Sequence, residues 1–188
     1  PPTNVYATMA LIDLKLKSVE IISEGHRNPQ GLLVTKDNTI LQTEHGPKGG
    51  DEINKIIKGK NYGWPTSSYG ERPGEEAYDE EYFYKKNHKN FNFVEPIYAF
   101  VPSIAISQII HVEKKFSNKW KNNFLITTLR DRSIYRTIFD EKFTRVVSME
   151  KIYIGKRIRD IAYNNKNNFI ILAMEDENGS LGFLSTYN

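Results

Sequence analysis

The chain has 188 residues, of which 39% are hydrophobic and 12% aromatic, a composition typical of one globular domain rather than of a disordered segment. Charged residues make up 26% and the formal net charge is only +3, so no basic block indicates nucleic acid as a partner. The absence of cysteine excludes disulfides, cysteine-ligated zinc and thiol catalysis. No apolar run approaches the roughly 18 residues that a membrane-spanning helix needs.

The predicted elements are strands. Helical periodicity is scarce, whereas short β-branched and aromatic runs recur between Asn, Gly, Asp and Lys. In chain order, strands are expected at residues 31–35, 39–43, 123–129, 133–139, 158–163, 169–174 and 181–185. Most connections are short, as in antiparallel meanders. The sequence therefore predicts an all-β fold.

A loose internal repeat runs along the chain. A polar or arginine-containing start leads into an apolar strand, a turn, and a second apolar strand that ends in charge. The copies lie at residues 26–45, 102–130 and 157–175. They predict about three four-stranded antiparallel blades of a β-propeller, with residues 1–188 as a single partial domain.

Propellers typically close with four to eight blades, so about three are too few. The start at Pro1 has neither an initiator Met nor the shape of a signal peptide. We therefore expect the C-terminal half of a larger propeller, completed by its remaining blades. A second chain, as in a self-complementing dimer, is the alternative.

A central irregular stretch spans residues 67–96 and contains runs of glycine, acidic residues and aromatics. A loop of this length inside a compact domain is usually functional or disordered. A solvated surface excursion explains the charges equally well.

Four polar segments stand next to apolar strands: residues 25–31 (GHRNPQG), 44–54 (EHGPKGGDEIN), 59–65 (GKNYGWP) and 156–160 (KRIRD). Glycine and proline turn the backbone and expose carbonyls, which together with carboxylates are the ligands that calcium accepts. The pair Asp51 and Glu52, close to Gly46 and Pro47, is therefore a candidate calcium loop. An ordinary charged turn is the alternative for this pair.

Four arginines occupy strand starts or ends that the repeat makes equivalent: Arg27, Arg130, Arg157 and Arg159. In a propeller such positions converge on the axis, where like charges would repel unless an anion neutralised them. Guanidinium groups bind carboxylates bidentately, so an anionic ligand is one interpretation. The other is local ion pairing with acids such as Asp131, Asp160 and Glu175.

The remaining candidates for chemistry are histidines and tryptophans. The four histidines show no metal-ligand spacing, and we expect structural roles for all of them: His26, His45, His88 and His111. Trp64 and Trp120 are expected in packing, although the segment around Trp64 is also suited to place an aromatic ring near a cofactor.

The four polar segments, in this order and spacing, resemble the C-terminal half of the soluble PQQ-dependent aldose sugar dehydrogenases, the glucose/sorbosone dehydrogenase family. The resemblance covers residues 12–184. It implies a six-bladed propeller that holds pyrroloquinoline quinone (PQQ) and calcium at its axial mouth. It also implies oxidation of aldose sugars at the anomeric carbon to lactones by hydride transfer to PQQ, which then passes electrons to an acceptor.

The resemblance implies roles for individual residues. Arg27 and Asn28 would meet the quinone side of PQQ, with Arg27 polarising it, while Arg157 and Arg159 would pair with its carboxylates. Arg130 stands where the family commonly has lysine, which keeps the charge but changes its reach.

Calcium positions follow from the same resemblance. The backbone carbonyls of Gly46 and Pro47 would hold the catalytic calcium, and Glu52 with Tyr62 would hold a second, structural one. The general base of the family is a histidine in a part of the propeller that this chain does not contain, so we expect the chain alone to be inactive.

One local departure and one alternative function qualify the resemblance. Residues 105–108 (AISQ) replace a stretch that in the family contains Pro and Ser. A propeller that has lost PQQ and serves as a ligand- or protein-binding module is the alternative function, because a fold does not fix a function. For the enzyme, family members imply a periplasmic or secreted location.

Overall fold

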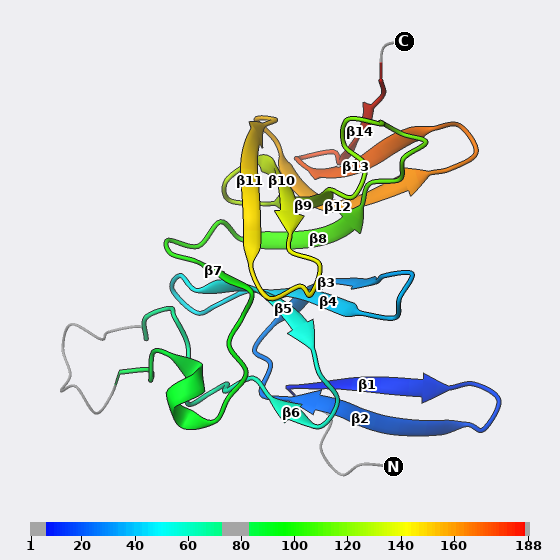
Figure 1. Ribbon diagram of the computed structural model, residues 1–188. Helices are drawn as coiled ribbons and strands as arrows, with labels where there is room; N and C mark the ends of the chain where they lie inside the picture. Colours follow the sequence, from blue (N-terminus) through cyan, green and yellow to red (C-terminus); the bar gives the residue numbers. More distant parts are fainter. Residues whose placement is uncertain (1–6, 73–82, 187–188) are drawn as a thin grey trace.

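The computed structural model describes residues 7–72 and 83–186, which form four sheets stacked one above another from the β1–β2 hairpin to β14 (Figure 1). The first sheet has the order β1-β2-β6 and consists of β1 (Thr8–Asp13), β2 (Ser18–Glu24) and β6 (Lys60–Asn61). The second has the order β3-β4-β5-β7 and consists of β3 (Pro29–Val34), β4 (Ile40–Glu44), β5 (Asp51–Ile56) and β7 (Tyr98–Phe100).

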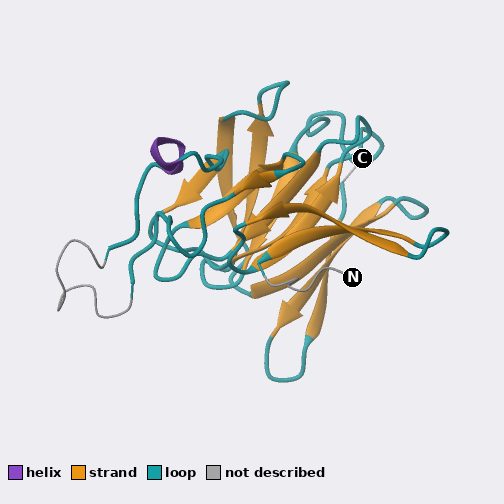
Figure 2. Ribbon diagram, turned by 90° about the horizontal axis from the view of Figure 1, so that it is seen from below, coloured by secondary structure: helices purple, strands orange, loops and turns teal. Residues whose placement is uncertain are grey.

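The other two sheets come from the second half of the chain. The third has the order β11-β10-β9-β8 and consists of β8 (Ile106–His111), β9 (Phe124–Thr128), β10 (Ser133–Phe139) and β11 (Val146–Tyr153). The fourth has the order β12-β13-β14 and consists of β12 (Arg157–Asn164), β13 (Phe169–Glu175) and β14 (Ser180–Leu184). All pairings are antiparallel except that of β2 with β6. Figure 2, seen from below, shows strand and loop throughout, apart from the short 3-10 turn η3 (His88–Phe91).

The all-β prediction and the expected strands are confirmed, several of them to within one residue, as for residues 133–139 and β10. The sheets are blades of a β-propeller, two of them complete and two with three strands, where the repeat predicted about three blades. The prediction missed the first sheet because this sheet has no arginine-containing start for the repeat to find.

Each interface between neighbouring sheets has its own apolar core. Ile22 and Ile56 pack between the first and second sheets, and Leu41 and Ile106 between the second and third. Successive side chains of β9 point to opposite faces of the third sheet. Ile126 therefore faces the second sheet, whereas Leu125 faces the fourth. Each fully buried side chain of this kind contributes roughly 1.5–3 kcal/mol to folding.

The inner strands β3, β8 and β12 lie side by side and start at the same level. The Leu32 amide donates to Gln108 Oε1 at 3.2 Å, and the Ser107 hydroxyl donates to the Ile158 carbonyl at 2.6 Å. Ser107 and Ile158 are each the second residue of their strand, and Leu32 is the fourth residue of β3. The starts of the three strands therefore meet at one end of the molecule.

The departure at residues 105–108 builds the contact between sheets. Ala105 takes a left-handed backbone conformation with φ +51°, and the next residue begins β8. The side chains of Ser107 and Gln108 then make the hydrogen bonds to neighbouring sheets given above. The unusual sequence thus forms an ordered strand start.

The irregular stretch 67–96 is confirmed as irregular where the structure describes it. It contains η3 and two isolated bridges, Lys48 with Glu71 and Ser67 with Lys85. Residues 73–82, which include much of the glycine-rich and acidic runs, lie outside the described residues.

Large apolar side chains are exposed on both terminal sheets. Leu11, Ile12 and Leu14 are exposed on the β1–β2 hairpin, and Leu181 and Phe183 on β14. Across residues 7–72 and 83–186, no helix has the length and apolar character needed to cross a membrane.

Candidate functional site

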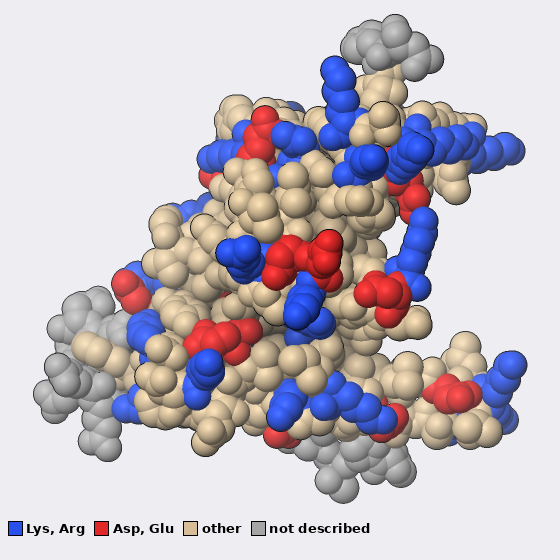
Figure 3. Space-filling model, viewed as in Figure 1, with Lys and Arg blue, Asp and Glu red and all other residues tan. Residues whose placement is uncertain are grey.

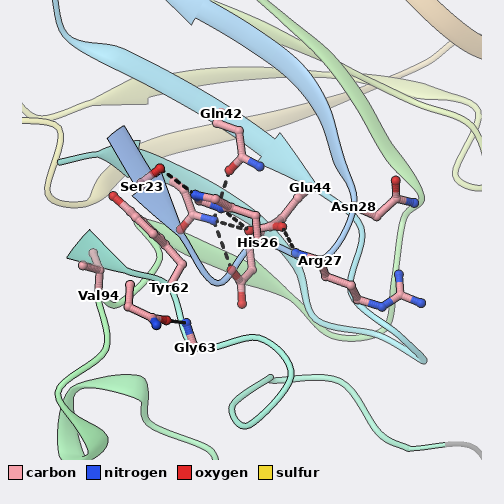
Figure 4. A network of polar contacts seen from close by, with 12 residues as sticks. Ser23, His26, Arg27, Asn28, Gln42, Glu44, Tyr62, Gly63 and Val94 are labelled. Carbon is pink, nitrogen blue, oxygen red and sulfur yellow. Dashed lines mark hydrogen bonds and ion pairs between the residues drawn. The ribbon is translucent and has the colours of Figure 1, made fainter. Parts of the chain in front are cut away.

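The site begins at a tight turn between β2 and β3. Gly25 has φ +76°, and a Cβ there would lie 2.2 Å from Asn61 Oδ1 and 2.7 Å from the Gly63 nitrogen. Only glycine permits this close approach. The turn buries His26 completely, with its ring stacked on Tyr62 at a centroid distance of 4.5 Å. His26 Nε2 lies 2.9 Å from the hydroxyl oxygen of Ser23, as Figure 4 shows.

Glu44, at the end of β4, joins this turn to β5 (Figure 4). Its Oε2 accepts the backbone N–H of Arg27 at 2.7 Å, and its Oε1 accepts Asn54 Nδ2 at 2.9 Å. His26 Nδ1 lies 3.4 Å from the same Oε1. The Asn54 amide nitrogen is also 3.1 Å from Glu52 Oε2. One buried carboxylate therefore holds the arginine-bearing turn against the acidic strand.

The two carboxylates of Glu44 and Glu52 are both buried, with 4% and 6% of each residue exposed. Burial, and then the negative charge of Glu44, raise the pKa of Glu52 to about 8. The imidazole of His88 lies 3.9 Å from Glu52, but burial lowers the pKa of His88 and so disfavours a compensating positive charge. The buried carboxyl groups of Glu44 and Glu52 therefore have no positive charge from His88 to balance them, and a nearby cation would stabilise their ionised forms.

A small cavity lies beside these carboxylates. Its volume of about 10 Å³ has room for one water molecule or ion. The lining includes Glu44, Glu52, Tyr62 and Gly46, with Arg27 and Trp64. Oxygen-rich surroundings with net negative charge are those that a hard cation such as calcium prefers.

The tyrosine can contribute to such a site only through its main chain. The Tyr62 hydroxyl donates to the Lys55 carbonyl at 2.5 Å and accepts the Ile57 N–H at 2.9 Å, so it is turned into the core. Within the described residues no cluster of three or more His, Asp or Glu side chains is arranged to hold a metal. Backbone carbonyls would have to complete the coordination.

The prediction of a calcium loop at Asp51 and Glu52 is wrong in its secondary structure, because these residues begin the buried strand β5. Asp51 is wholly buried and accepts the N–H groups of Gly46, Ile104 and Ile106, each at 3.1 Å, as well as the Ser103 hydroxyl at 2.8 Å. Its oxygens are fully engaged by the protein. Asp51 is therefore a structural anchor for the turn that contains Gly46 and Pro47.

Arg27 lies exposed beside the cavity. Its Nη1 donates to the His45 carbonyl at 3.2 Å, and its guanidinium carbon lies 5.3 Å from the centroid of the Trp64 ring. Asn28 Nδ2 is 3.5 Å from His45 Nδ1. Trp64 thus lies beside both Arg27 and the small cavity.

The other arginines lie on the third and fourth sheets. Arg157 and Arg159 each place Nη2 3.1 Å from Glu175 Oε2, so local ion pairing does occur for these two. One carboxylate serves two guanidinium groups, which leaves a net positive charge. The side chain of Arg130 is exposed and has no hydrogen-bond or ion-pair partner in the described part of the chain.

The topology brings the arginines to one end of the inner strands. Arg27 lies two residues before β3, and Arg157 is the first residue of β12. Arg130 follows β9, whose last residue Thr128 pairs with Ile106 at the start of β8. The repeat therefore predicted correctly that these positions share one end. Asp131 and Asp160 bind elsewhere: Asp131 pairs with Lys151 at 2.8 Å, and Asp160 accepts the N–H of Ile161.

Comparison with known proteins places these features in context. The model of the family described as glucose/sorbosone dehydrogenase matches residues 5–183. The chain is 30% identical over 183 residues to the aldose sugar dehydrogenase YliI of Escherichia coli, covering 90% of this chain and 44% of that protein. It is 59% identical over 46 residues to quinoprotein glucose dehydrogenase B of Acinetobacter calcoaceticus, covering 24% of this chain and 10% of that protein.

A solved structure shows the same architecture. The crystal structure of the soluble aldose sugar dehydrogenase from Escherichia coli in its apo-form superposes with a TM-score of 0.74 at 29% identity, over 86% of this chain and 46% of that one. The chain spans less than half the length of the curated relatives it matches.

Proposed function

This chain belongs to the glucose/sorbosone dehydrogenase family, and from that premise we propose that it forms part of a PQQ- and calcium-dependent aldose sugar dehydrogenase. The reaction would oxidise an aldose at its anomeric carbon to a lactone. The chain would supply one wall of the cofactor site and its cation ligands, and the remaining blades would supply the rest.

One observation carries the proposal: the Arg27 turn, at the end of the inner strands where β12 also begins, lies beside two buried carboxylates that have no cation partner in the described residues. Arg27 lines the cavity that Glu44 and Glu52 enclose, and Glu44 holds the backbone of Arg27 at 2.7 Å. An anionic cofactor and a divalent cation together would neutralise both sets of charges. The name of the Acinetobacter relative, a quinoprotein, supports a quinone as that cofactor.

Two cation positions fit the donors present. Glu52 and the main-chain carbonyl of Tyr62 would hold a structural calcium, with Glu44 adjacent. The carbonyls of Gly46 and Pro47 would hold a second calcium next to the cofactor. The turn that presents them is fixed by the hydrogen bond from the Gly46 amide to Asp51 at 3.1 Å.

When bound, PQQ would supply hydride-accepting chemistry at a quinone carbon. Arg27 and Asn28 would orient its quinone side, and Arg27 would stabilise negative charge that develops on the quinone oxygen. Arg157 and Arg159 would exchange the shared Glu175 carboxylate for carboxylates of the cofactor, with Arg130 adding positive charge nearby. The proton acceptor for the sugar hydroxyl would come from the remaining blades, and so the chain alone would be inactive.

The test is reconstitution of the full-length protein that contains these residues. PQQ and calcium chloride are added in turn, and reduction of an artificial dye by glucose and other aldoses is followed. We expect turnover only with both additions, and a loss of at least 100-fold in kcat/KM for Arg27→Gln. Arg145→Gln, an exposed arginine on the β10–β11 turn, is the matched control and should keep full activity.

No turnover with any aldose would contradict the enzyme proposal. Binding of PQQ without turnover, or no binding at all, would instead favour a propeller that acts as a binding module. Two further proposals rest on family membership alone: a separate electron acceptor reoxidises the cofactor, and the protein works in the periplasm or outside the cell.

A further inference from the structure

A second cavity lies at the opposite end of the inner strands from the arginines. Its volume is about 430 Å³, within the range of small-molecule sites. It lies between the β3–β4 turn of the second sheet and the strand ends and β10–β11 turn of the third. The six residues of β3 separate it from the Arg27 end by about 20 Å, at about 3.3 Å per residue. Both sheets are complete, so the cavity does not depend on the exposed terminal sheets.

The wall of this cavity is aromatic. Phe124 contacts Phe139 and Phe143 with ring centroids 5.1 and 5.7 Å away. Phe143 has φ +53°, a left-handed conformation that is uncommon for a bulky side chain. Strain of this kind persists only where the surroundings enforce it, and it often marks functional sites. His111 packs on Phe124 at 5.1 Å, and burial lowers the pKa of His111, so its imidazole is neutral at pH 7.

The rim of the cavity is acidic. Asp37, Asp140 and Glu141 line it together with a single basic side chain, Lys36. Lys36 is already paired with Glu113, outside the lining, at 3.2 Å. Hydrogen bonds from threonine hydroxyls, Thr35 for Asp37 and Thr144 for Asp140, lower the pKa of both aspartates, so both stay ionised. Figure 3 shows a patch of Asp and Glu side chains in the middle of one face of the molecule, with Lys and Arg side chains next to it.

We propose that this cavity binds a small organic cation, an ammonium group carried on an apolar body. Aromatic walls accept the apolar body and attract the cation through their ring faces. The carboxylates at the rim complement the positive charge, and the one lysine there is neutralised by its own partner. A neutral ligand would use only the apolar wall, and an anion would meet three carboxylates.

Isothermal titration of the full-length protein with benzyltrimethylammonium tests the proposal, with benzyl alcohol as the neutral comparator of similar ring size. We expect saturable binding of the cation, weakened at least threefold between 20 and 500 mM salt because exposed charges are screened. Benzyl alcohol should bind at least 10-fold more weakly. Equal binding of the two probes, or none by the cation, would overturn the proposal.

Charge reversal at the rim locates the site. Glu141→Lys changes an exposed residue in the β10–β11 turn and should weaken binding of benzyltrimethylammonium at least fivefold. Glu177→Lys makes the same change on an exposed turn of the fourth sheet and should leave the affinity unchanged. If both variants, or neither, lose affinity, the cation binds elsewhere and the assignment fails. The site is independent of PQQ, so dye reduction is expected to be the same in both variants.

Discussion

Glu44 links the Arg27 turn to strand β5 in the candidate site. It accepts a backbone N–H from the Arg27 turn and a side-chain N–H from Asn54 on β5. A buried acceptor shared between two segments fixes their relative position, and loss of that acceptor leaves a donor unpaired at a cost of about 1–3 kcal/mol.

Glu44→Gln should therefore lower the free energy of unfolding by about 1–3 kcal/mol, because an amide cannot accept on both of its terminal atoms. Denaturant titration at pH 7 with saturating calcium measures this change. Glu24→Gln is the matched control, since Glu24 accepts Asn61 Nδ2 at 3.0 Å but is exposed. A loss at Glu44 no larger than that at Glu24 would show that the bridge is dispensable.

The raised pKa of Glu52 makes stability depend on pH. Its carboxyl titrates near 4.5 when unfolded and at about 8 when folded, so the folded form holds its proton more tightly. This contribution is fully present below about pH 4.5 and is lost as pH rises toward about 8. Without calcium, stability should fall across this window, and Glu52→Gln should flatten the profile. Thermal unfolding with EDTA at several pH values tests this, and a wild-type slope that persists in Glu52→Gln would refute it.

The sequence indicates a candidate site residue where that residue lies in a glycine-rich polar segment. It does not indicate a role that depends on contacts between distant segments. Arg27 and Glu52 stand in glycine-rich segments that attract attention in the sequence. The roles of Glu44 and Asn54 depend on pairing between β4 and β5, which the sequence does not display. Glu44 and Asn54 are the two ends of the polar segment 44–54. A further signal is the run of three polar residues in β4, Gln42, Thr43 and Glu44, because polar side chains buried in a core strand need partners.

At the scale of elements, Asp51 fastens three segments together. It lies at the start of β5 and receives hydrogen bonds from the Gly46 turn and from the chain that leads into β8. Because the acceptor is a fully buried carboxylate, each of these hydrogen bonds is stronger than one between neutral groups.

Asp51→Asn should lower the free energy of unfolding by about 3 kcal/mol, since the amide group turns a donor toward other donors. Asp160→Asn is the matched control: Asp160 is exposed and accepts the N–H of Ile161 at 2.8 Å. Chemical denaturation of both variants measures the difference. Comparable losses in the two variants would mean that Asp51 is not an anchor.

Strands were predictable where turn formers bracket apolar runs, as at β3, β4 and β10. The sequence of β5, DEINKI, begins with two acids, which favour a loop over a strand at Asp51 and Glu52. These two acidic side chains can be buried because other parts of the chain donate hydrogen bonds to them. Most of the donors to Asp51 lie far away in the sequence, so the local pattern does not reveal them. β11 was missed because most of its residues are exposed, which removes the alternation on which strand prediction depends.

At the scale of the whole molecule, the repeat and the resemblance to a known family both predicted part of a β-propeller, which is confirmed, and both implied about three blades. The repeat indicated about three blades, whereas the described residues form four sheets. The sheet order depends on β6 pairing with β2 and on β7 pairing with β5 across the irregular stretch, and no local sequence pattern reports either pairing.

The separate apolar core at each interface also determines how the molecule opens. Each sheet rests only on its sequence neighbours, so the stability of this arc resembles a chain of nearest-neighbour couplings rather than one indivisible unit. The second and third sheets are coupled on both faces, the first and fourth on one. Within these four sheets, the amide protons of β4 and β9 should therefore exchange last, because both strands lie in sheets that have a packed neighbour on each face. The buried carboxylates of Glu44 and Glu52 lie on β4 and β5, in this slowly exchanging part.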